Sequence, residues 1–597
     1  MTATDWGVVP RFRDTPGGWR DVDPAVEAAI LDAMGADPGA APPASPVRLV
    51  AAGDPLPYTG ELLLEDGSSL GAGDRLPPDL PYGYHRLLTD EGELLLIAAP
   101  PRCPTPALRR WGFATQLYAT RSSGSWGIGD LADLRELARW SRGLGAGFCV
   151  VNPLHAAAPV GAQEASPYFP SSRRFRSPLY LRPELVPGAD AVVRSLGARA
   201  RQLNDERRID RDRVAELKMV ALEAAWTAAP RGGTFAAFRA AYGAPLEEWA
   251  TFCAVAERFG SRWPDWPADL RTPRGAAAFA RAHADRVAFH AWLQWLLDEQ
   301  LAAAAAEIDL VGDMAIGFDP AGADAWAWQE QLAHGVTIGA PPDTFNARGQ
   351  NWSLPPFVPH RLRQAGYRPF IETIRATLRH AGGLRIDHIM GLFRLWWIPA
   401  GGDPAEGAYV RYPADELLAV VALEAHRANA LIVGEDLGTV EPGVREALAE
   451  RGILSYRLLI FEPDASRYPE LALAAVTTHD LPTIAGTWSG ADLEQQRRAS
   501  LVPDVGGLAR LRAPLAAAAP PDADARAAIL AAHARLASSP SLLVAATLED
   551  ALAVEERPNL PGTTADQAPN WSIALPRSLE EIEEDPFVRR LASALRR

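Results

Sequence analysis

Three carboxylic acids in separate parts of the chain have the positions needed to act on one substrate. Asp387 follows the apolar string GLRI, Glu435 follows LIVG, and Asp480 ends the string TTHD. One carboxylate can attack an anomeric carbon while a second, protonated one gives its proton to the departing oxygen. Acids of this kind, brought into one pocket, suit the cleavage or transfer of a glycosidic bond.

The expected strand positions of the first two acids favour a retaining reaction. We expect Asp387 and Glu435 to lie on neighbouring strands, the fourth and fifth of a barrel. Neighbouring strands lie about 4.8 Å apart, close to the roughly 5–5.5 Å between the two carboxyl groups of retaining enzymes and below the distance in inverting ones. Asp480, two strands further round, could bind hydroxyls of the same sugar ring and favour its distorted transition state.

Side chains next to these acids could adjust their pKa values. Arg385 lies two residues before Asp387 and therefore points to the same side of the strand, where its charge would keep Asp387 ionised as a nucleophile must be. Glu435 must instead hold a proton near neutral pH, so we expect burial or the neighbouring acids to raise its pKa. His388 and His479 flank the acids and could donate to sugar hydroxyls, although an isolated histidine is more often a packed core residue.

A metal site is the alternative interpretation of the same acids. Asp313, Asp387 and Glu435 would follow the third, fourth and fifth strands, and hard divalent cations prefer carboxylate oxygens as ligands. A metal-dependent barrel enzyme would lose activity with a chelator, whereas an enzyme that uses the acids directly would keep it. A catalytically silent glucan-binding protein is a further alternative.

The acids need a scaffold, and the alternation of sequence patterns after Pro104 predicts one. Segments with a helical sequence pattern alternate with eight apolar runs, at residues 113–120, 148–154, 309–316, 383–389, 431–437, 455–461, 473–480 and 541–548. Continuous apolar runs are typical of parallel strands buried on both faces. We therefore predict an α/β fold, a (β/α)8 TIM barrel, in which the reacting groups lie at the carboxyl ends of the strands.

Insertions and an amino-terminal extension complete the predicted organisation. Residues 1–103 form a small β-rich module with a leading helix, in which Asp23 is the N-cap, and residues 104–597 form the catalytic barrel. An excess of helical sequence between the second and third strands predicts an inserted subdomain at about 155–305. The Pro- and Gly-rich segment at about 335–360 is interpreted as an active-site loop over the pocket.

Composition limits the function classes. The formal charge of −15 disfavours nucleic acid and anionic membrane as partners, since both require a basic face. The amino terminus lacks a signal-peptide pattern and the chain lacks a run of about 18 apolar residues, so we expect a cytoplasmic protein. Cys103, Cys149 and Cys253 lie far apart and are expected to be buried free thiols.

Several strings together resemble the 4-α-glucanotransferases, or amylomaltases, of glycoside hydrolase family 77. They are GGLRIDH, GEDLG, TTHDLPT, SPY, SWGIGDL and GAPPDTFN, and they occur in the family's order from about Trp111 to the NLPGTT and PNW strings near Asn559 and Trp571. The third-strand string GDMAIGFD lacks the histidine usual in the wider amylase clan, which also favours this family over an α-amylase. The strings GQNWSLPPF and NWSI depart from the usual family pattern, which bears on acceptor preference and product size.

The resemblance implies that Asp387 is the nucleophile, Glu435 the acid/base and Asp480 the transition-state stabiliser. The substrate-binding residues that we expect are Ser166, Tyr168, Asp313, Asp343, Trp352, Arg385, His388 and His479. The family needs neither a metal nor an organic cofactor. The implied partners are α-1,4-glucans and maltooligosaccharides, with glucose as an acceptor, and the implied state is a monomer or homodimer without nucleic acid or membrane.

The implied reaction is transfer through a covalent glycosyl-aspartate. A donor chain would lose its reducing-end portion, and the rest would pass to the 4-hydroxyl of another glucan or of glucose. Water competes for the same intermediate, so transfer requires an acceptor that is bound in an attacking pose. The aromatic faces of Tyr168 and Trp352 suit glucose rings, and a proline-stiffened loop limits the access of water. A hydrolase or branching enzyme of the same clan is the alternative.

Overall fold

Eight parallel strands close into a barrel in this computed structural model, which describes residues 2–13, 18–37, 39–56, 59–228, 232–342 and 348–596. The strands are β8 (Arg110–Thr115), β9 (Phe148–Val151), β12 (Asp309–Met314), β15 (Gly383–Ile386), β18 (Leu431–Gly434), β19 (Leu454–Leu458), β20 (Ala472–Ala475) and β21 (Leu543–Thr547). Each overlaps one predicted run, and β21 pairs with β8 to close the ring. The predicted (β/α)8 barrel is confirmed.

The strands form because their side chains are buried on both faces. Every residue of β15, β18 and β20 is buried. Val311, Val433, Leu454 and Leu543 belong to one apolar cluster formed by the barrel strands, and packed apolar side chains of this kind are the main source of stability. Arg385 on β15 is the polar exception, and its surroundings are described below.

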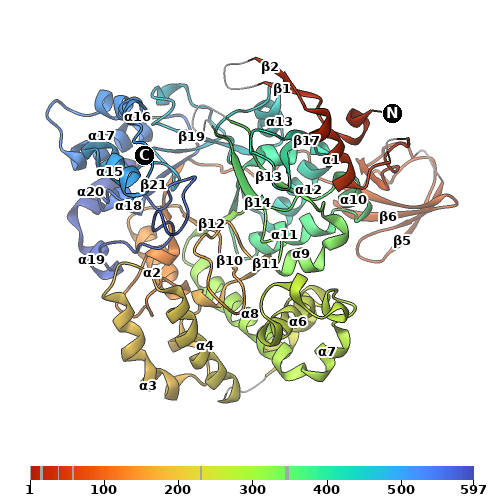
Figure 1. Cartoon of the computed structure of the whole chain (residues 1–597), viewed down its shortest axis with the longest axis horizontal. Helices are drawn as coiled ribbons and strands as arrows, with labels where there is room; N and C mark the ends of the chain where they lie inside the picture. The colour runs from red at the N-terminus through yellow and green to blue at the C-terminus, as the bar shows by residue number, and fades with distance from the viewer. Residues whose placement is uncertain are drawn as a thin grey trace.

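Helices surround the barrel (Figure 1). Those between the first strands are α2 (Leu131–Gly143), α8 (Ala284–Ala305), α11 (Arg368–Leu378), α12 (Ala414–Ala428) and α13 (Val444–Glu450). After β20 come α14 (Ile484–Ser489), α15 (Ala491–Arg498), α16 (Val505–Ala518) and α17 (Ala525–Ala537), and after β21 come α18 (Leu548–Ala551), α19 (Leu579–Glu584) and α20 (Pro586–Leu595). These last seven helices gather on one side of the molecule (Figure 1).

The segment between β9 and α8 extends below the barrel in Figure 1. It contains the short strand pair β10 (His155–Ala156) and β11 (Ser172–Arg176), then α3 (Asp190–Arg201), α4 (Arg211–Ala228), α5 (Gly233–Tyr242), α6 (Ala244–Phe259) and α7 (Ala277–Ala282). The predicted helical character is correct, but the strand pair was not foreseen. Two further short helices, α9 (Ala323–Ala327) and α10 (Pro359–Gln364), follow β12.

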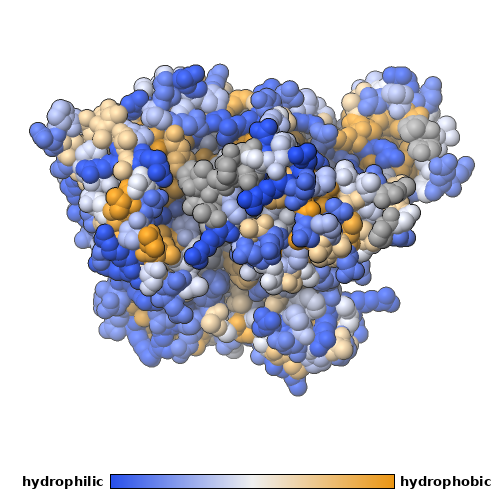
Figure 2. All heavy atoms as spheres, turned by 45° about the horizontal axis from the view of Figure 1, so that its top comes forward, coloured by the Kyte–Doolittle hydropathy of each residue, from blue (hydrophilic) through white to orange (hydrophobic). Residues whose placement is uncertain are grey.

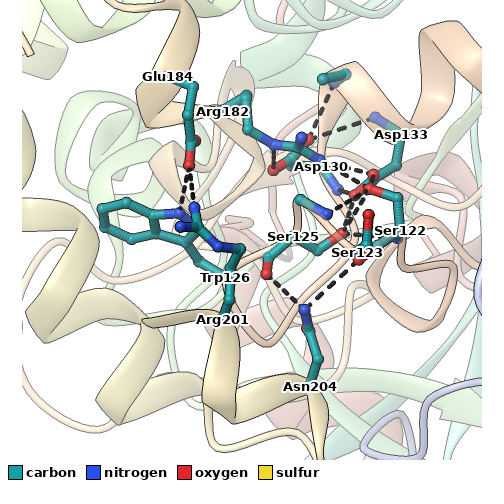
Figure 3. Close-up of polar contacts among 12 residues, drawn as sticks. Ser122, Ser123, Ser125, Trp126, Asp130, Asp133, Arg182, Glu184, Arg201 and Asn204 are labelled. Carbon is teal, nitrogen blue, oxygen red and sulfur yellow. Dashed lines mark hydrogen bonds and ion pairs between the residues drawn. The ribbon is translucent and has the colours of Figure 1, made fainter. Parts of the chain in front are cut away.

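A buried polar cluster fixes this insertion to the start of α2 (Figure 3). Arg182 donates to Asp130, the N-cap of α2, at 2.7 Å and to Asp133 at 2.6 Å. The buried Lys218 ammonium donates to the carbonyls of Leu179 and Leu181 and lies 3.6 Å from Asp130. The buried acids are therefore compensated by cations that come from the insertion, which gives the string SWGIGDL a structural role.

A five-stranded sheet forms most of the amino-terminal extension, at the right of Figure 1. Its order is β3 (Val47–Val50), β7 (Gly92–Ala98), β6 (Gly83–Thr89), β4 (Gly60–Leu63) and β5 (Ser69–Ala72). Asp90 and Glu91 form the turn of a hairpin between β6 and β7, because Thr89 pairs with Gly92. Asp23 caps α1 (Pro24–Met34), as expected, by accepting from the Ala25 N–H. However, α1 packs against a strand of a different sheet, β16 (Arg394–Pro399).

That second sheet has the order β14 (Gln350–Leu354), β13 (Val336–Ala340), β16 (Arg394–Pro399) and β17 (Ala408–Arg411). The segment at 335–360 was expected to be a loop, but it contains two paired strands, with Ala340 opposite Gln350. The Pro and Gly residues around the turn predicted a loop, whereas pairing with the distant β16 makes a sheet. The adjacent pair β1 (Arg11–Arg13) and β2 (Trp19–Asp21) also extends from the amino terminus.

The surface and the cysteines agree with the composition. The coloured part of the face in Figure 2 is mostly hydrophilic, with apolar residues in small patches. Within the described ranges, no helix combines the length and apolar character needed to cross a membrane. Cys103, Cys149 and Cys253 are free and buried, as predicted.

Candidate active site

The register of the barrel brings Asp387 and Glu435 to adjacent positions. Ile386 on β15 pairs with Gly434 on β18, and the two acids are the next residue of each chain segment. The backbone ladder continues to both of them, because Asp387 N–H donates to Met314 O at 3.1 Å and Glu435 N–H donates to Ile386 O at 3.0 Å. The acids therefore lie at the carboxyl ends of neighbouring strands, whose backbones are about 4.8 Å apart.

Asp387 lies against a guanidinium. Arg385 Nη2 is 3.1 Å from Asp387 Oδ1, and the aspartate side chain remains 21% exposed. Arg385 was expected to keep Asp387 ionised, but burial outweighs the guanidinium and raises the pKa of Asp387 to about 7, with Asp313 and Glu435 adding to the rise. Asp387 is therefore only partly ionised at neutral pH, in spite of the guanidinium beside it.

Asp313 and Tyr168 hold Arg385 in place. Asp313 pairs with Arg385 across β12 and β15, and Arg385 Nη1 donates to both Asp313 oxygens at 2.7 and 2.8 Å. The Tyr168 hydroxyl donates to Asp313 Oδ2 at 2.7 Å. Both Asp313 oxygens are therefore engaged by protein donors, which disfavours the metal interpretation. Among the described residues, no three His, Cys, Asp or Glu side chains are grouped as metal ligands.

Glu435 is held by two backbone donors. Its Oε2 accepts from the His388 N–H at 2.9 Å and its Oε1 from the Leu437 N–H at 2.7 Å. His388 has a φ of 45°, a left-handed conformation that is uncommon outside glycine and that turns its N–H towards the acid. Burial raises the pKa of Glu435, as predicted, although Arg385 and the two N–H groups oppose the rise. Because the guanidinium contacts Asp387 directly, a single proton shared by the two acids belongs on Glu435.

The next residue, Asp436, has a different task that sequence reasoning missed. It is fully buried and accepts from Ser455 Oγ at 2.6 Å, the Tyr456 N–H at 2.8 Å and Arg445 Nε at 2.8 Å. The string GED therefore places one acid in the site and uses the other to anchor β19. The alternation of side chains along a strand was the available signal.

Asp480 is an ionised acid. His479 Nε2 lies 3.3 Å from its Oδ2, and Asn559 Nδ2 donates to its Oδ1 at 2.7 Å. Burial raises the pKa of Asp480, but His479 and Asn559 outweigh it and lower the pKa to about 2. For His479, burial lowers the pKa and Asp480 more than compensates, so its pKa is raised. Asn559 was part of a family string only, and the structure adds it to the site.

Aromatic rings form one wall beside these acids. The Tyr168 ring stacks on His479 with centroids 5.2 Å apart, and Trp571 lies 5.4 Å from Tyr168 and 5.2 Å from His479. Ser166, predicted as a sugar contact, accepts from the Tyr168 N–H through its Oγ at 3.3 Å. Ser166 therefore orients Tyr168, and Trp571 is an additional member of the wall that sequence reasoning had placed only in the PNW string.

Trp352 lies on β14, where its ring is 5.2 Å from His388 in an edge-on arrangement. Burial and the nearby Arg394 lower the pKa of His388 to about 4, so this imidazole is neutral at pH 7. Asp343 lies outside the described residues. The contacts connect the other predicted residues in two groups. One group surrounds Asp387, Glu435 and Trp352, and the other surrounds Asp480 and Tyr168. Asp313, bound by Tyr168, and Arg385, beside Asp387, join the two groups.

Comparison with known proteins shows which family the chain belongs to. Residues 115–579 match glycoside hydrolase family 77, described as 4-alpha-glucanotransferase. The chain belongs to this family. The 4-alpha-glucanotransferase of Mycobacterium tuberculosis strain H37Rv is 44% identical over 89% of this chain and 82% of its own length. The 4-alpha-glucanotransferase of Haemophilus influenzae is 36% identical over 70% of this chain and 67% of its own.

Two solved amylomaltase structures are similar to this chain. The amylomaltase from Corynebacterium glutamicum matches 100% of this chain and 99% of its own, with a TM-score of 0.88 and 31% identity. An amylomaltase from Streptococcus agalactiae in complex with acarbose covers 81% of this chain and 98% of its own, with a TM-score of 0.68. At 18% identity, this second match supports the fold alone. The family 77 resemblance of the sequence is confirmed.

The raised pKa of Asp387 predicts how the stability of this family 77 protein depends on pH. In the unfolded chain an aspartate titrates near 3.9, whereas in the fold Asp387 titrates at about 7. Between these values the folded state binds the extra proton, so the contribution of Asp387 to the free energy of unfolding falls as pH rises from about 4 to 7. Asp387→Asn should therefore melt at a higher temperature than the wild type at pH 8.

Thermal unfolding monitored by circular dichroism checks this expectation. The stability difference between the two proteins should shrink as pH is lowered from 8 and vanish below about pH 3, where Asp387 is protonated in both states. A difference that is independent of pH, or a variant that is less stable at pH 8, would contradict the assigned pKa.

Proposed function

We propose that the chain is a retaining 4-α-glucanotransferase in which Asp387 and Glu435 carry out the bond exchange. The observation that carries the proposal is the register of β15 and β18, which sets the two acids side by side. Of these two acids, Asp387 is the one at ion-pair distance from Arg385. Family 77 membership supplies the reaction class. The donors are α-1,4-glucans and maltooligosaccharides, and the acceptors are other glucans or glucose.

The first half-reaction breaks the donor bond. The Asp387 carboxylate attacks the anomeric carbon while Glu435 gives its proton to the departing glycosidic oxygen, so the reducing-end fragment leaves as an alcohol and a glycosyl ester forms on Asp387. The Arg385 guanidinium orients the attacking carboxylate. The ionised Asp480 binds hydroxyls of the same ring most strongly when the ring distorts toward the oxocarbenium ion, which stabilises the transition state.

The second half-reaction returns the proton. Glu435, now ionised, takes the proton of the acceptor 4-hydroxyl, whose oxygen attacks the anomeric carbon, and Asp387 departs as a carboxylate. Two inversions restore the α configuration. The raised pKa of Glu435 supports both roles, because an acid that titrates near the operating pH exchanges protons in either direction.

Transfer instead of hydrolysis follows from acceptor binding. The rings of Tyr168, His479 and Trp571, together with the Trp352 ring beside His388, offer apolar surfaces for glucose units. An acceptor held in an attacking pose has an effective concentration that can exceed that of water by several orders of magnitude. A hydrolase would not need such a wall on the acceptor side, and this is why we favour transfer.

The test is the product profile from maltotriose. The wild-type protein should convert maltotriose into glucose and a ladder of longer oligosaccharides, measured by anion-exchange chromatography. The rate should be unchanged after treatment with EDTA, since the acid/base group and the nucleophile are both side chains. Shorter sugars alone would indicate a hydrolase, loss of activity with EDTA would favour the metal interpretation, and an unchanged sugar would favour a silent glucan-binding protein.

The remaining expectations concern the setting of the reaction. The cytoplasmic location, the monomeric or homodimeric state and the boundaries of the amino-terminal module at 1–103 and of the insertion at about 155–305 stay predictions. The net charge of −15 supports a neutral glucan as the partner in place of nucleic acid or an anionic membrane.

A further inference from the structure

We propose that Arg557, held by Asp492, is a positioning residue for Asp480. The inference rests on the function proposed above, in which Asp480 stabilises the transition state. Arg557 lies in the segment after α18 and Asp492 lies on α15, so neither belongs to the barrel strand that carries the acid. The pair links two peripheral segments to the backbone of Asp480.

Asp480 needs such support because it lies beyond the regular barrel. β20 ends at Ala475, and the parallel ladder extends one residue further, with Ile460 N–H donating to Val476 O. Asp480 is four residues past Val476, and its N–H donates to the neighbouring Thr478 hydroxyl at 3.3 Å. Asp387 and Glu435, in contrast, are fixed by the ladder itself. The position of Asp480 therefore depends on contacts from outside the sheet.

Arg557 supplies one of these contacts. Its Nε and Nη2 donate to the two oxygens of Asp492 at 2.8 and 2.9 Å, a bidentate arrangement that fixes the plane of the guanidinium. The remaining Nη1 donates to the Asp480 carbonyl at 3.3 Å. The Arg557 side chain is 8% exposed and that of Asp492 is 1% exposed, so water competes little with these bonds. These hydrogen bonds thus connect α15 to the backbone of Asp480.

The segment around Arg557 makes parallel contacts. Asn559 donates its N–H to the His479 carbonyl at 3.1 Å and its side-chain amide to Asp480 at 2.7 Å. On the side of α15, the side-chain oxygen of Gln495 accepts from the Arg557 N–H at 3.3 Å, and its amide donates to the Glu555 carbonyl at 3.0 Å. Residues 555–559 therefore connect α15 to the His479–Asp480 pair, with Arg557 as the charged centre.

The test compares variants of the pair by steady-state kinetics with maltotriose. Arg557→Gln and Asp492→Asn should each lower kcat by about 10- to 100-fold, while KM changes by less than about twofold, because a misplaced Asp480 loses contacts that strengthen only in the transition state. Arg557→Lys should recover part of the rate, since an ammonium keeps the charge but lacks the bidentate fork. The double variant should be no slower than Arg557→Gln, because both changes break one unit.

Glu556→Gln is the matched control. Glu556 lies in the same segment but pairs at the surface with Arg207 at 2.9 Å, where both side chains are more than a third exposed. This variant should keep the wild-type kcat and KM. All variants are assayed at least 15 degrees below their measured melting temperatures, and Asp492→Asn and Arg557→Lys decide the matter if Arg557→Gln does not fold.

The outcomes separate this inference from the proposed function. A wild-type enzyme that forms no oligosaccharide ladder would refute the proposed function. An active wild type combined with Arg557→Gln and Asp492→Asn variants that keep full kcat would overturn the positioning role. A loss confined to KM or to the melting temperature would also overturn it, because a purely structural pair would give that result.

Discussion

Asp387→Asn should lower the turnover of maltotriose by roughly 10⁴-fold or more, the largest effect expected for any single substitution in this chain. An asparagine amide does not form the glycosyl ester, so the reaction loses its covalent route. The fold should persist, because asparagine has nearly the same shape and Arg385 keeps its contacts with Asp313 at 2.7 and 2.8 Å. Glucose release measured by a coupled assay gives the rate.

Asp309→Asn is the control for this substitution. Asp309 begins β12 at the opposite end of the barrel and pairs with Arg110 at 2.5 Å. Removing its charge alters an ion pair on a barrel strand without touching the site, and surface pairs of this kind contribute little. Its rate should match that of the wild type. An Asp387→Asn protein within tenfold of the wild-type rate would show that the nucleophile is a different group.

The local pattern of the sequence was sufficient for the barrel and its acids. Parallel strands covered by helices need continuous apolar residues, so the runs around GLRI and LIVG stood out. Because parallel strands present their carboxyl ends on one face, the residues after the runs had to converge there. Asp387 and Glu435 followed from these two facts. The raised pKa of Glu435 followed as well, since it requires only burial.

Features that depend on contacts between residues far apart in the chain could not be predicted from the local sequence pattern. The sequence predicts a loop where β13 and β14 lie, because β13 pairs not only with β14 but also with β16, which begins more than fifty residues further along the chain. Asn559 and Arg557 reach Asp480 from a segment with no strand or helix of its own. The pKa of Asp387 is set by the balance between its burial and the charge of Arg385. The sequence specifies the charged residues but not how deeply Asp387 is buried.

Glu435→Gln should have the second-largest effect, a loss of roughly 10²- to 10⁴-fold with maltotriose. Glutamine neither protonates the departing oxygen nor deprotonates the acceptor. Its single carbonyl oxygen keeps one of the two hydrogen bonds that Glu435 accepts from the His388 and Leu437 N–H groups. With α-maltosyl fluoride as donor, the first step should be far less affected, because fluoride leaves without a proton. Release of fluoride in the first turnover, before the intermediate must react with an acceptor, checks this difference and is the fluoride rate used below.

The two donors act as controls for each other. A general acid is needed only for the alcohol leaving group, so the ratio of the maltotriose and fluoride rates should change by at least about 100-fold between wild type and variant. An equal loss with both donors would mean that Glu435 acts on something other than the leaving group, for example on the shape of the site.

The same variant gives the most direct test of the central claim, that a glycosyl group is carried on Asp387. In Glu435→Gln the fluoride donor still loads the nucleophile, but the acceptor is no longer deprotonated, so the intermediate should accumulate. After an acid quench and proteolysis, mass spectrometry should find the peptide that contains Asp387 heavier by one maltosyl group, with the ester on that side chain. A label on another residue, or no label alongside a product of inverted configuration, would contradict the account.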